Sequence, residues 1–153
     1  MSRDVTCEEF SEYLKRTVPL LRNEIAKSLE LCSHKVRSDI QSSMAHTERN
    51  MEVSYFTNNR RKAHHPSMPG NPPAPDTGNL RNSIRYEITA GTTESYAIIG
   101  TTQKDPPYGE YLEYGTKKMK PRPWLRPAMK NNEEWIRKTI ANAVIRALRG
   151  AAK

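Results

Sequence analysis

The stretch from Tyr108 to Met129, YGEYLEYGTKKMKPRPWLRPAM, decides how this chain is organised. Tyr108, Tyr111 and Leu112 recur at spacings of three and four residues, which predicts one or two turns of helix. Gly115 follows at the point where a helix C-terminal cap takes a left-handed residue, so we expect the helix to end there.

A basic segment follows this short helix. The cations of this segment are Lys117, Lys118, Lys120, Arg122, Arg126 and Lys130. No acidic residue occurs between Gly115 and Lys130. The prolines among them hold the backbone extended until Pro127 can occupy the first turn of a helix. We expect Trp124 and Leu125 to anchor the segment to the core. The cations from Lys117 to Arg122 are expected to be flexible and solvated, and to face DNA or a partner.

A second motif, PPAPDTGNLRNSI, lies upstream at Pro72–Ile84. Together with YGEYLEYGT and RPWLRPAM, in this order, it resembles the tail-component or tail-completion proteins of long-tailed bacteriophages. That family's pattern is PP…DTG.LR.SI, a pair of strands, Y..YLE.GT, RPWLRPA and a C-terminal helix. The resemblance covers roughly residues 64 to 148, and its specificity lies in the ordered combination. Residues 101–107, TTQKDPP, depart from the pattern as an insertion before the short helix.

The resemblance implies a structural virion subunit and not an enzyme. Tail-completion, neck or tail-terminator proteins of this kind take part in tail assembly and head-tail joining, and form a ring, here expected to be a hexamer. The ring would contact tail-tube and connector or stopper proteins, and genomic DNA would pass through it. We therefore expect assembly in the host cytoplasm, a place in the virion, and no cofactor. The residues that match the family motif are Asp76, Thr77, Gly78, Leu80, Ser83, Tyr111, Glu113, Gly115, Thr116, Pro123, Trp124 and Pro127.

Composition sets broad limits on the protein. Its 153 residues suit one domain, but a hydrophobic content of 35% with only two Phe predicts a thin core that gains burial from partners. A net charge of +8 favours contact with a polyanion or an acidic protein surface. No apolar run approaches the roughly 20 residues that span a bilayer, and the first ten residues lack the apolar region of a signal peptide.

The first 49 residues predict one long amphipathic helix. Its apolar positions recur at three or four residues: Phe10, Leu14, Leu21, Ile25, Leu29, Cys32, Val36, Ile40 and Met44. Thr6 and Glu9 form a capping box, and Pro19 is expected to kink or divide the helix, with Thr17 as a second cap. A small sheet cannot cover so long a stripe. Part of it should therefore pack on a neighbouring subunit, with a coiled-coil dimer as the rival interpretation.

The two cysteines are expected to be reduced packing residues. Along a helix, Cys7 and Cys32 would be on the order of 37 Å apart, beyond disulfide reach.

Residues 57–75 predict a basic, proline-rich arm after a short strand at Met51–Phe56. Arg60, Arg61 and Lys62 are its candidate contacts with DNA or a partner. Five prolines follow, so we expect an extended, exposed segment without a regular ladder. The adjacent histidines at 64 and 65 suggest zinc, but no further ligand follows at suitable spacing.

The remainder predicts a hairpin and a helix. Ser83–Ala90 alternates apolar and polar residues, and Ser95–Thr101 is expected to be a more buried antiparallel partner. Within residues 76–126 these strands and the central motif form one region. Residues 127–149 predict a helix with Gly150 as its cap, and its stripe comprises Ile136, Ile140, Val144 and Leu148. The predicted fold is α+β: a long N-terminal helix, a small antiparallel sheet and a C-terminal helix packed on the sheet.

Two other functions fit parts of the sequence. Asp76-Thr77-Gly78 is also the signature of aspartic proteases, whose Asp must follow a buried strand, yet Pro73-Ala74-Pro75 precedes it here. Asp76 or Thr77 is better explained as the N-cap of a short turn, with Gly78 giving room for close packing. The second alternative is a basic nucleic-acid-binding protein that uses the two cationic segments, although no recognition motif is present. No nucleophile elbow, phosphate-binding glycine loop or paired-cysteine metal site occurs in the sequence.

Overall fold

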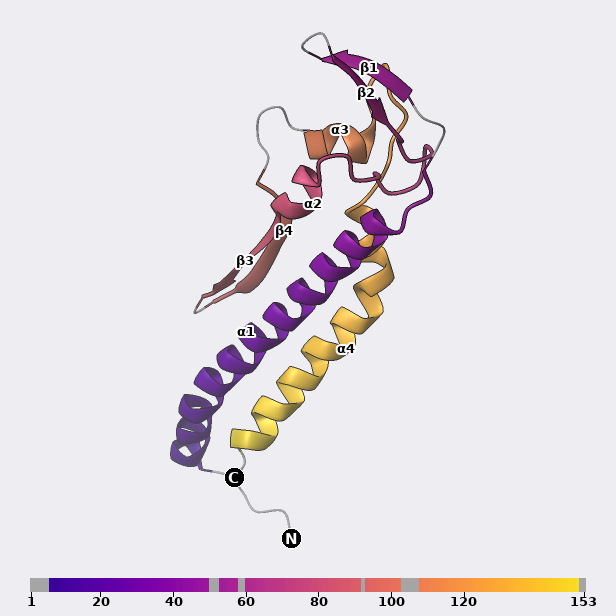
Figure 1. Cartoon of the computed structure of the whole chain (residues 1–153). Coiled ribbons are helices and arrows are strands. Elements are labelled where there is room, and N and C mark those ends of the chain that lie inside the picture. Colours follow the sequence, from indigo (N-terminus) through magenta and orange to yellow (C-terminus); the bar gives the residue numbers. More distant parts are fainter. Residues whose placement is uncertain (1–5, 50–52, 58–59, 92, 103–107, 152–153) are drawn as a thin grey trace. The chain divides into compact units, whose positions relative to one another are not determined.

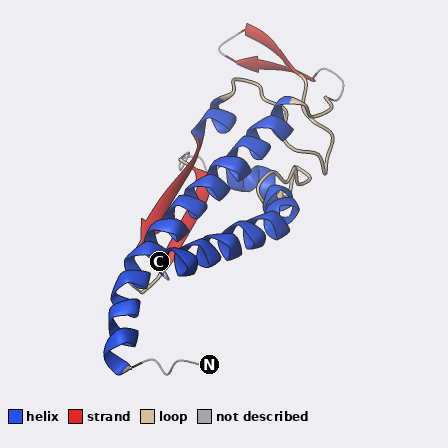
Figure 2. Cartoon of the chain, turned by 90° about the horizontal axis from the view of Figure 1, so that it is seen from below, coloured by secondary structure: helices blue, strands red, loops and turns tan. Residues whose placement is uncertain are grey.

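The computed structural model describes residues 6–49, 53–57, 60–91, 93–102 and 108–151, without the side chains of 53–57 and 60–64 (Figure 1). Its elements are α1 (Cys7–Ala45), β1 (Val53–Thr57), β2 (Arg60–His64), α2 (Asn79–Ser83), β3 (Ile84–Ala90), β4 (Ser95–Thr101), α3 (Tyr108–Tyr114) and α4 (Arg126–Ala151). Helices dominate, and the strands form two separate two-stranded sheets, coloured red in Figure 2. The predicted α+β class is confirmed.

The chain divides into two compact units. Unit 1 comprises Met1–Ser33, Glu87–Ile98 and Glu133–Lys153, and unit 2 comprises His34–Tyr86 and Ile99–Asn132. Both long helices and both strands of the β3–β4 sheet run from one unit into the other. No helix in the described residues combines the length and apolar character that crossing a membrane requires.

Helix α1 starts as predicted but is not divided. The Thr6 N–H donates to Glu9 Oε2 at 3.1 Å and the Glu9 N–H donates to Thr6 Oγ1 at 3.2 Å, which completes the capping box. Pro19 lies inside the continuous helix. Thr17 is not a second cap, because it is buried inside the helix and its hydroxyl donates to the Tyr13 carbonyl at 2.7 Å.

The apolar stripe of α1 is covered along only part of its length. Cys32, Val36, Ile40 and Met44 are buried, Leu21, Ile25 and Leu29 are half-buried, and Phe10 and Leu14 are exposed. The predicted stripe is therefore present, and its N-terminal third lacks a covering element among the described residues. Cys7 is exposed, so the expectation that it packs in a core is wrong, whereas burial raises the pKa of the Cys32 thiol.

In unit 1, α4 packs on α1 through small residues. Ala143, Ala147 and Ala151 are buried at four-residue spacing, and a Cβ on Gly150 would lie 3.8 Å from Leu20 Cδ1. The Arg146 Nε donates to Glu24 Oε2 at 2.8 Å across the two helices, and this hydrogen bond is the largest of the causes that lower the Glu24 pKa.

The apolar stripe predicted for the C-terminal helix needs correction. Ile136, Ile140 and Val144 are half-buried, but Leu148 is exposed, because the close approach of the two helices uses the alanine face of α4. Gly150 is a helical residue of α4 and not its cap.

In unit 2, the start of α4 is joined to the end of α1. The buried Asn132 donates through Nδ2 to Asp39 Oδ2 at 2.8 Å and to the Ala128 carbonyl at 2.9 Å. Burial raises the Asp39 pKa, but hydrogen bonds from Lys35 and Asn132 outweigh it, so the pKa is lowered.

The prediction of an exposed arm without a regular ladder at residues 57–75 is wrong, first for the ladder and then for the exposure. Residues 60–64 form β2, which pairs antiparallel with β1 from Val53↔His64 to Thr57↔Arg60, so a regular ladder does form. The prolines begin only after β2 and do not interrupt it.

Residues 65–75 are tied to the rest of unit 2. Ser67 is buried, the Thr47 hydroxyl donates to the Pro72 carbonyl at 2.9 Å, and the Gly70 N–H donates to the Pro121 carbonyl at 2.9 Å. This segment is therefore packed against its unit, although it lacks regular secondary structure.

The second sheet has the predicted strands. The Gly91 N–H donates to the Glu94 carbonyl at 2.8 Å at its turn. β4 has fewer exposed residues than β3, two against four, as predicted, but Tyr96 and Ile98 are exposed, so the apolar run of β4 is not fully buried. An apolar run without polar alternation does not reveal whether one face or both faces are covered.

Candidate functional site

The family-like motifs meet around the carboxylate of Glu113, at the end of α3. Its Oε2 accepts hydrogen bonds from the N–H groups of Trp124 at 2.7 Å and Leu125 at 2.9 Å. Its Oε1 accepts from the Arg126 N–H at 3.1 Å and from Arg126 Nε at 2.9 Å. The first N–H groups of a helix lack intrahelical acceptors, and α4 begins at Arg126. Glu113 therefore caps α4 from a different helix.

Electrostatics favour the ionised form of this carboxyl group. Burial acts to raise the pKa of Glu113, whose residue is only 4% exposed, but hydrogen bonds from Leu125, Trp124 and Arg126 outweigh burial and lower it. The Arg126 guanidinium also stacks over the Tyr114 ring, 4.8 Å from its centroid. Glu113 thereby forms an ion pair with Arg126 of the basic segment.

Trp124 is the second centre of this arrangement. It is 4% exposed, which confirms its predicted burial, and its Nε1 donates to the Gly109 carbonyl at 2.9 Å. A Cβ on Gly109 would lie 2.9 Å from Thr101 Cγ2 and 3.4 Å from the Trp124 ring, so a larger residue here would force the Thr101 side chain to shift. The buried Leu80 of α2 approaches the same point from the DTG motif. Three sequence segments are thereby packed around one indole.

Ser83 links the upstream motif to the hairpin. Its hydroxyl lies 2.6 Å from Thr101 Oγ1, and the Thr102 N–H donates to its carbonyl at 3.0 Å. Ser83 thus ties the start of β3 to the end of β4, a structural task that its motif position does not reveal.

The basic segment opens with a tight turn. Gly115 has φ 78°, as predicted for a helix C-terminal cap, and the N–H and carbonyl groups of Thr116 and Met119 bond each other at 2.8 and 3.3 Å. Lys117 and Lys118 form the tip of this turn, and both are exposed. The turn presents these lysines on a defined backbone.

Substitution of Gly115 by alanine is expected to lower the free energy of unfolding by about 2 kcal/mol or more, since a non-glycine residue at positive φ costs on the order of 1–3 kcal/mol. The new Cβ would also lie 2.8 Å from the Met119 carbonyl oxygen. Gly70→Ala is a matched control, because Gly70 also has positive φ but open space around it. Urea denaturation of both variants measures the difference, and equal losses would contradict the close approach.

Arg122 differs from the lysines before it. It is half-buried, and its Nε donates to the Ser67 carbonyl at 3.1 Å. The expectation that Arg122 is flexible and solvated is therefore wrong, while Lys117, Lys118 and Lys120 are exposed as expected. Arg122 joins the segment after β2 to the segment before α4.

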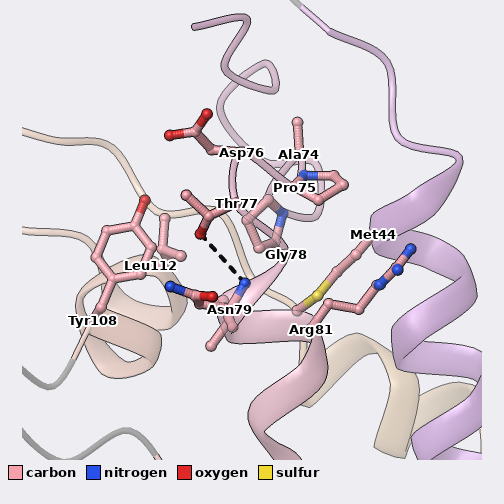
Figure 3. A pocket seen from close by; sticks show the side chains of 12 residues that line it. Met44, Ala74, Pro75, Asp76, Thr77, Gly78, Asn79, Arg81, Tyr108 and Leu112 are labelled. Carbon is pink, nitrogen blue, oxygen red and sulfur yellow. Dashed lines mark hydrogen bonds between the residues drawn. The ribbon is translucent and has the colours of Figure 1, made fainter.

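The DTG motif lines a pocket of about 320 Å³ in unit 2 (Figure 3). Met44, Tyr108 and Leu112 contribute to its walls. Asp76 is exposed at the pocket, and its carboxylate points away from Met44. Thr77 Oγ1 accepts a long hydrogen bond, 3.4 Å, from the Asn79 N–H.

The predicted role of Gly78 needs correction. It is itself the N-cap residue of α2, with φ 77° and ψ −2°, so a left-handed backbone conformation and not close packing requires glycine here. A Cβ would meet only the Asn82 side chain, at 3.6 Å. Asp76 follows Pro75 and no strand, so the buried-strand geometry of an aspartic protease is absent from the described residues around it.

The remaining candidates do not share one site. Tyr111 is exposed on α3, and Pro127 lies in the first turn of α4 as predicted. Pro123 is half-buried beside Trp124. The side chains of Arg60, Arg61 and Lys62 lie outside the described residues. Within the part of the chain that the structure describes, no cluster of three His, Cys, Asp or Glu could hold a metal ion.

Comparisons with family models, with curated proteins and with solved structures find no match for this chain.

Proposed function

We propose that this chain is a structural subunit of a bacteriophage virion, a tail-completion or neck protein that forms a ring at the head-tail junction. The observation that carries the proposal is that the motif residues make structural contacts within the fold. Glu113 caps α4, Trp124 is buried against Gly109, and Gly115 forms a turn. Residues of the family-like motifs therefore build a framework, which suits a virion subunit whose work is assembly.

The distribution of charge supports a division of tasks between the units. Unit 2 contains 15 Lys and Arg against 7 Asp and Glu, whereas unit 1 contains 10 of each. The whole net charge of +8 therefore belongs to unit 2. In a ring through which DNA passes, a cationic part can face the DNA phosphates, and a neutral, apolar part can contact other subunits.

Native mass spectrometry of the purified protein, followed by electron microscopy, tests the ring. The proposal expects a closed assembly of one stoichiometry, with a hexamer as the expected form. Joining is tested with separately purified phage heads and tails that lack this chain, combined with the recombinant protein. A monomer at all concentrations up to about 100 µM, together with no effect on joining, would overturn the proposal.

The same charge distribution favours the second candidate, a basic nucleic-acid-binding protein. Filter binding to duplex DNA over a salt series separates the two. A binder that neutralises Z phosphates shows a slope of about −0.9Z in log affinity against log salt. A monomer with a steep slope would favour the second candidate, and a ring with weak affinity would favour the first.

The three exposed lysines of the turn provide a further prediction. Simultaneous replacement of Lys117, Lys118 and Lys120 by glutamine is expected to change the free energy of unfolding by less than about 1 kcal/mol and to leave the ring intact, because surface charges contribute little. Head-tail joining is expected to fall, and the difference from the unsubstituted protein is expected to narrow as salt rises, because salt screens the charges that were removed. A control replaces Lys15, Lys27 and Lys138 of unit 1, which are also exposed, each in an ion pair with a glutamate of its own helix. Equal joining by both triple variants would contradict a role for the turn.

A further inference from the structure

We infer that one surface of unit 2 binds the phosphate backbone of duplex DNA, independently of the base sequence. This cationic surface joins residues 60–62 of β2 to the three exposed lysines of the turn after α3, Lys117, Lys118 and Lys120. Such binding does not depend on the proposed ring. It specifies the ligand and the surface that both candidate functions leave open.

The β1–β2 hairpin distributes its cations over both of its faces. Arg60, Arg61 and Lys62 occupy consecutive positions of β2, and successive residues of a strand belong to opposite faces. Arg61 therefore shares a face with its register partner Phe56, whereas Lys62 shares the other face with Tyr55. Residues 53–75 contain no acid. Each face of this two-stranded ribbon thus includes at least one cation and no acid.

The lysines of the turn are available to an external anion. Lys117, Lys118 and Lys120 are exposed, and none of them forms an ion pair within the part of the chain that the structure describes. Residues 114–132 contain no acid. The three exposed lysines of unit 1 that were chosen above as a control differ in this respect, because each pairs with a glutamate of its own helix.

Two hydrogen bonds join the end of the hairpin to the end of the turn. Arg122 Nε donates to the Ser67 carbonyl at 3.1 Å, and the Gly70 N–H donates to the Pro121 carbonyl at 2.9 Å. Ser67 also forms a β-bridge with Arg49, which closes the base of the hairpin. Ser67 follows the end of β2 by three residues, a stretch that spans at most about 11 Å. Two cationic segments that are distant in sequence therefore lie on neighbouring backbone.

The kind of cation favours a phosphate backbone over an acidic protein as the ligand. Four of the six cations on this surface are lysines. Lysine is depleted at protein–protein interfaces, where arginine and aromatic residues are enriched. Lysine and arginine together make many of the contacts to phosphate oxygens in protein–DNA complexes, and these contacts carry no sequence information. Binding to this surface should therefore be equal for duplexes of unrelated sequence.

The arrangement of the cations favours a duplex over a single strand. Two phosphate strands border each groove of a duplex, and the major groove, roughly 12 Å wide, admits a two-stranded β-ribbon. The hairpin is such a ribbon, with cations on both faces, and the turn adds a second group on neighbouring backbone. A single strand offers one line of phosphates and binds by stacking of its bases on aromatic side chains. Residues 115–120 of the turn include no aromatic residue.

The test measures binding of the full chain to a fluorescent duplex by anisotropy over a salt series. The hairpin pair is Arg61→Gln with Lys62→Gln, and the turn pair is Lys117→Gln with Lys118→Gln. Each pair is expected to weaken binding at least about 10-fold near 100 mM salt, and to reduce the slope of log affinity against log salt by about 2, since each phosphate contact contributes about 0.9. Two duplexes of unrelated sequence should give the same affinities.

Arg16→Gln with Arg149→Gln is the matched control. Both arginines are exposed in unit 1, and neither forms an ion pair among the described residues. This variant removes the same charge and is expected to change the affinity by less than about twofold, because charges away from the DNA are screened. Circular dichroism melting checks the folding of every variant. Any pair that does not fold is replaced by Lys62→Gln or Lys118→Gln alone, with an expected reduction in slope of about 1.

The outcomes separate this binding from the proposed ring. A loss of affinity in only one pair, or equal affinities for both pairs and the control, would overturn the joint surface. Tighter binding of a single strand of the same length would overturn the duplex, and equal competition by polyglutamate per charge would overturn the phosphate backbone. A monomer that shows both losses upholds the DNA surface while the ring fails. A closed ring that does not bind DNA overturns the DNA surface and leaves the ring standing.

Discussion

Replacement of Trp124 by alanine is expected to lower the free energy of unfolding by about 3–5 kcal/mol, the largest loss of any substitution considered for this chain. The indole is buried among α2, α3 and the segment before α4, and its removal opens a cavity beside Gly109. For a chain of this length, such a loss lowers the melting temperature by roughly 6–20 °C. Differential scanning calorimetry measures it.

Trp124→Phe separates packing from hydrogen bonding. Phenylalanine retains most of the apolar volume but leaves the Gly109 carbonyl without the Nε1 donor, at a cost of about 1–3 kcal/mol. The phenylalanine variant should therefore melt between the alanine variant and the unsubstituted protein. An alanine variant that melts and assembles normally would mean that Trp124 does not anchor the fold.

Replacement of Glu113 by glutamine is expected to cost about 2–4 kcal/mol at neutral pH. The amide presents one acceptor oxygen, and its NH₂ group would face N–H groups that now donate to a carboxylate oxygen. A cap residue alone contributes up to about 2 kcal/mol, and this carboxylate serves three N–H groups and a guanidinium. Glu110→Gln, on an exposed position of α3, is the control and should be neutral.

The cost of Glu113→Gln should depend on pH. Because the folded state lowers the pKa of Glu113, the carboxylate stabilises the fold fully above its unfolded pKa, and this stabilisation is lost as pH falls through the lower folded pKa. Urea denaturation between pH 7 and pH 2.5 should therefore show the variant and the unsubstituted protein converging in acid. A gap that stays constant across this range would show that ionised Glu113 is not the cause.

Local signals in the sequence located most elements well. The capping box of Thr6 and Glu9, the left-handed Gly115 and the first-turn Pro127 each reflect backbone chemistry within a few residues, and the structure confirms all three. Residues 84–90 and 95–101 form strands because their composition favours them. These boundaries could therefore be predicted, whereas β2 and the end of α4 could not.

Contacts between distant segments could not be predicted in the same way. Nothing near Glu113 in the sequence indicates that it accepts hydrogen bonds from residues 124–126, since an acid three residues from another acid also fits a solvated surface. The half-buried Arg122 looked like its lysine neighbours because its partner, the Ser67 carbonyl, lies 55 positions away. The exposed face of β4 was missed because the pattern of one strand does not reveal what covers it.

The tight turn at Thr116–Met119 has a practical consequence for labelling. The chain enters and leaves this turn through reciprocal hydrogen bonds, so its two ends are already adjacent. A short peptide or a fluorophore site inserted between Lys117 and Lys118 lengthens a surface tip without pulling on the strands or helices. Insertion a few residues later, between Trp124 and Arg126, would break the alignment of consecutive N–H groups on one carboxylate. An insertion in this basic turn therefore leaves the surrounding backbone contacts intact.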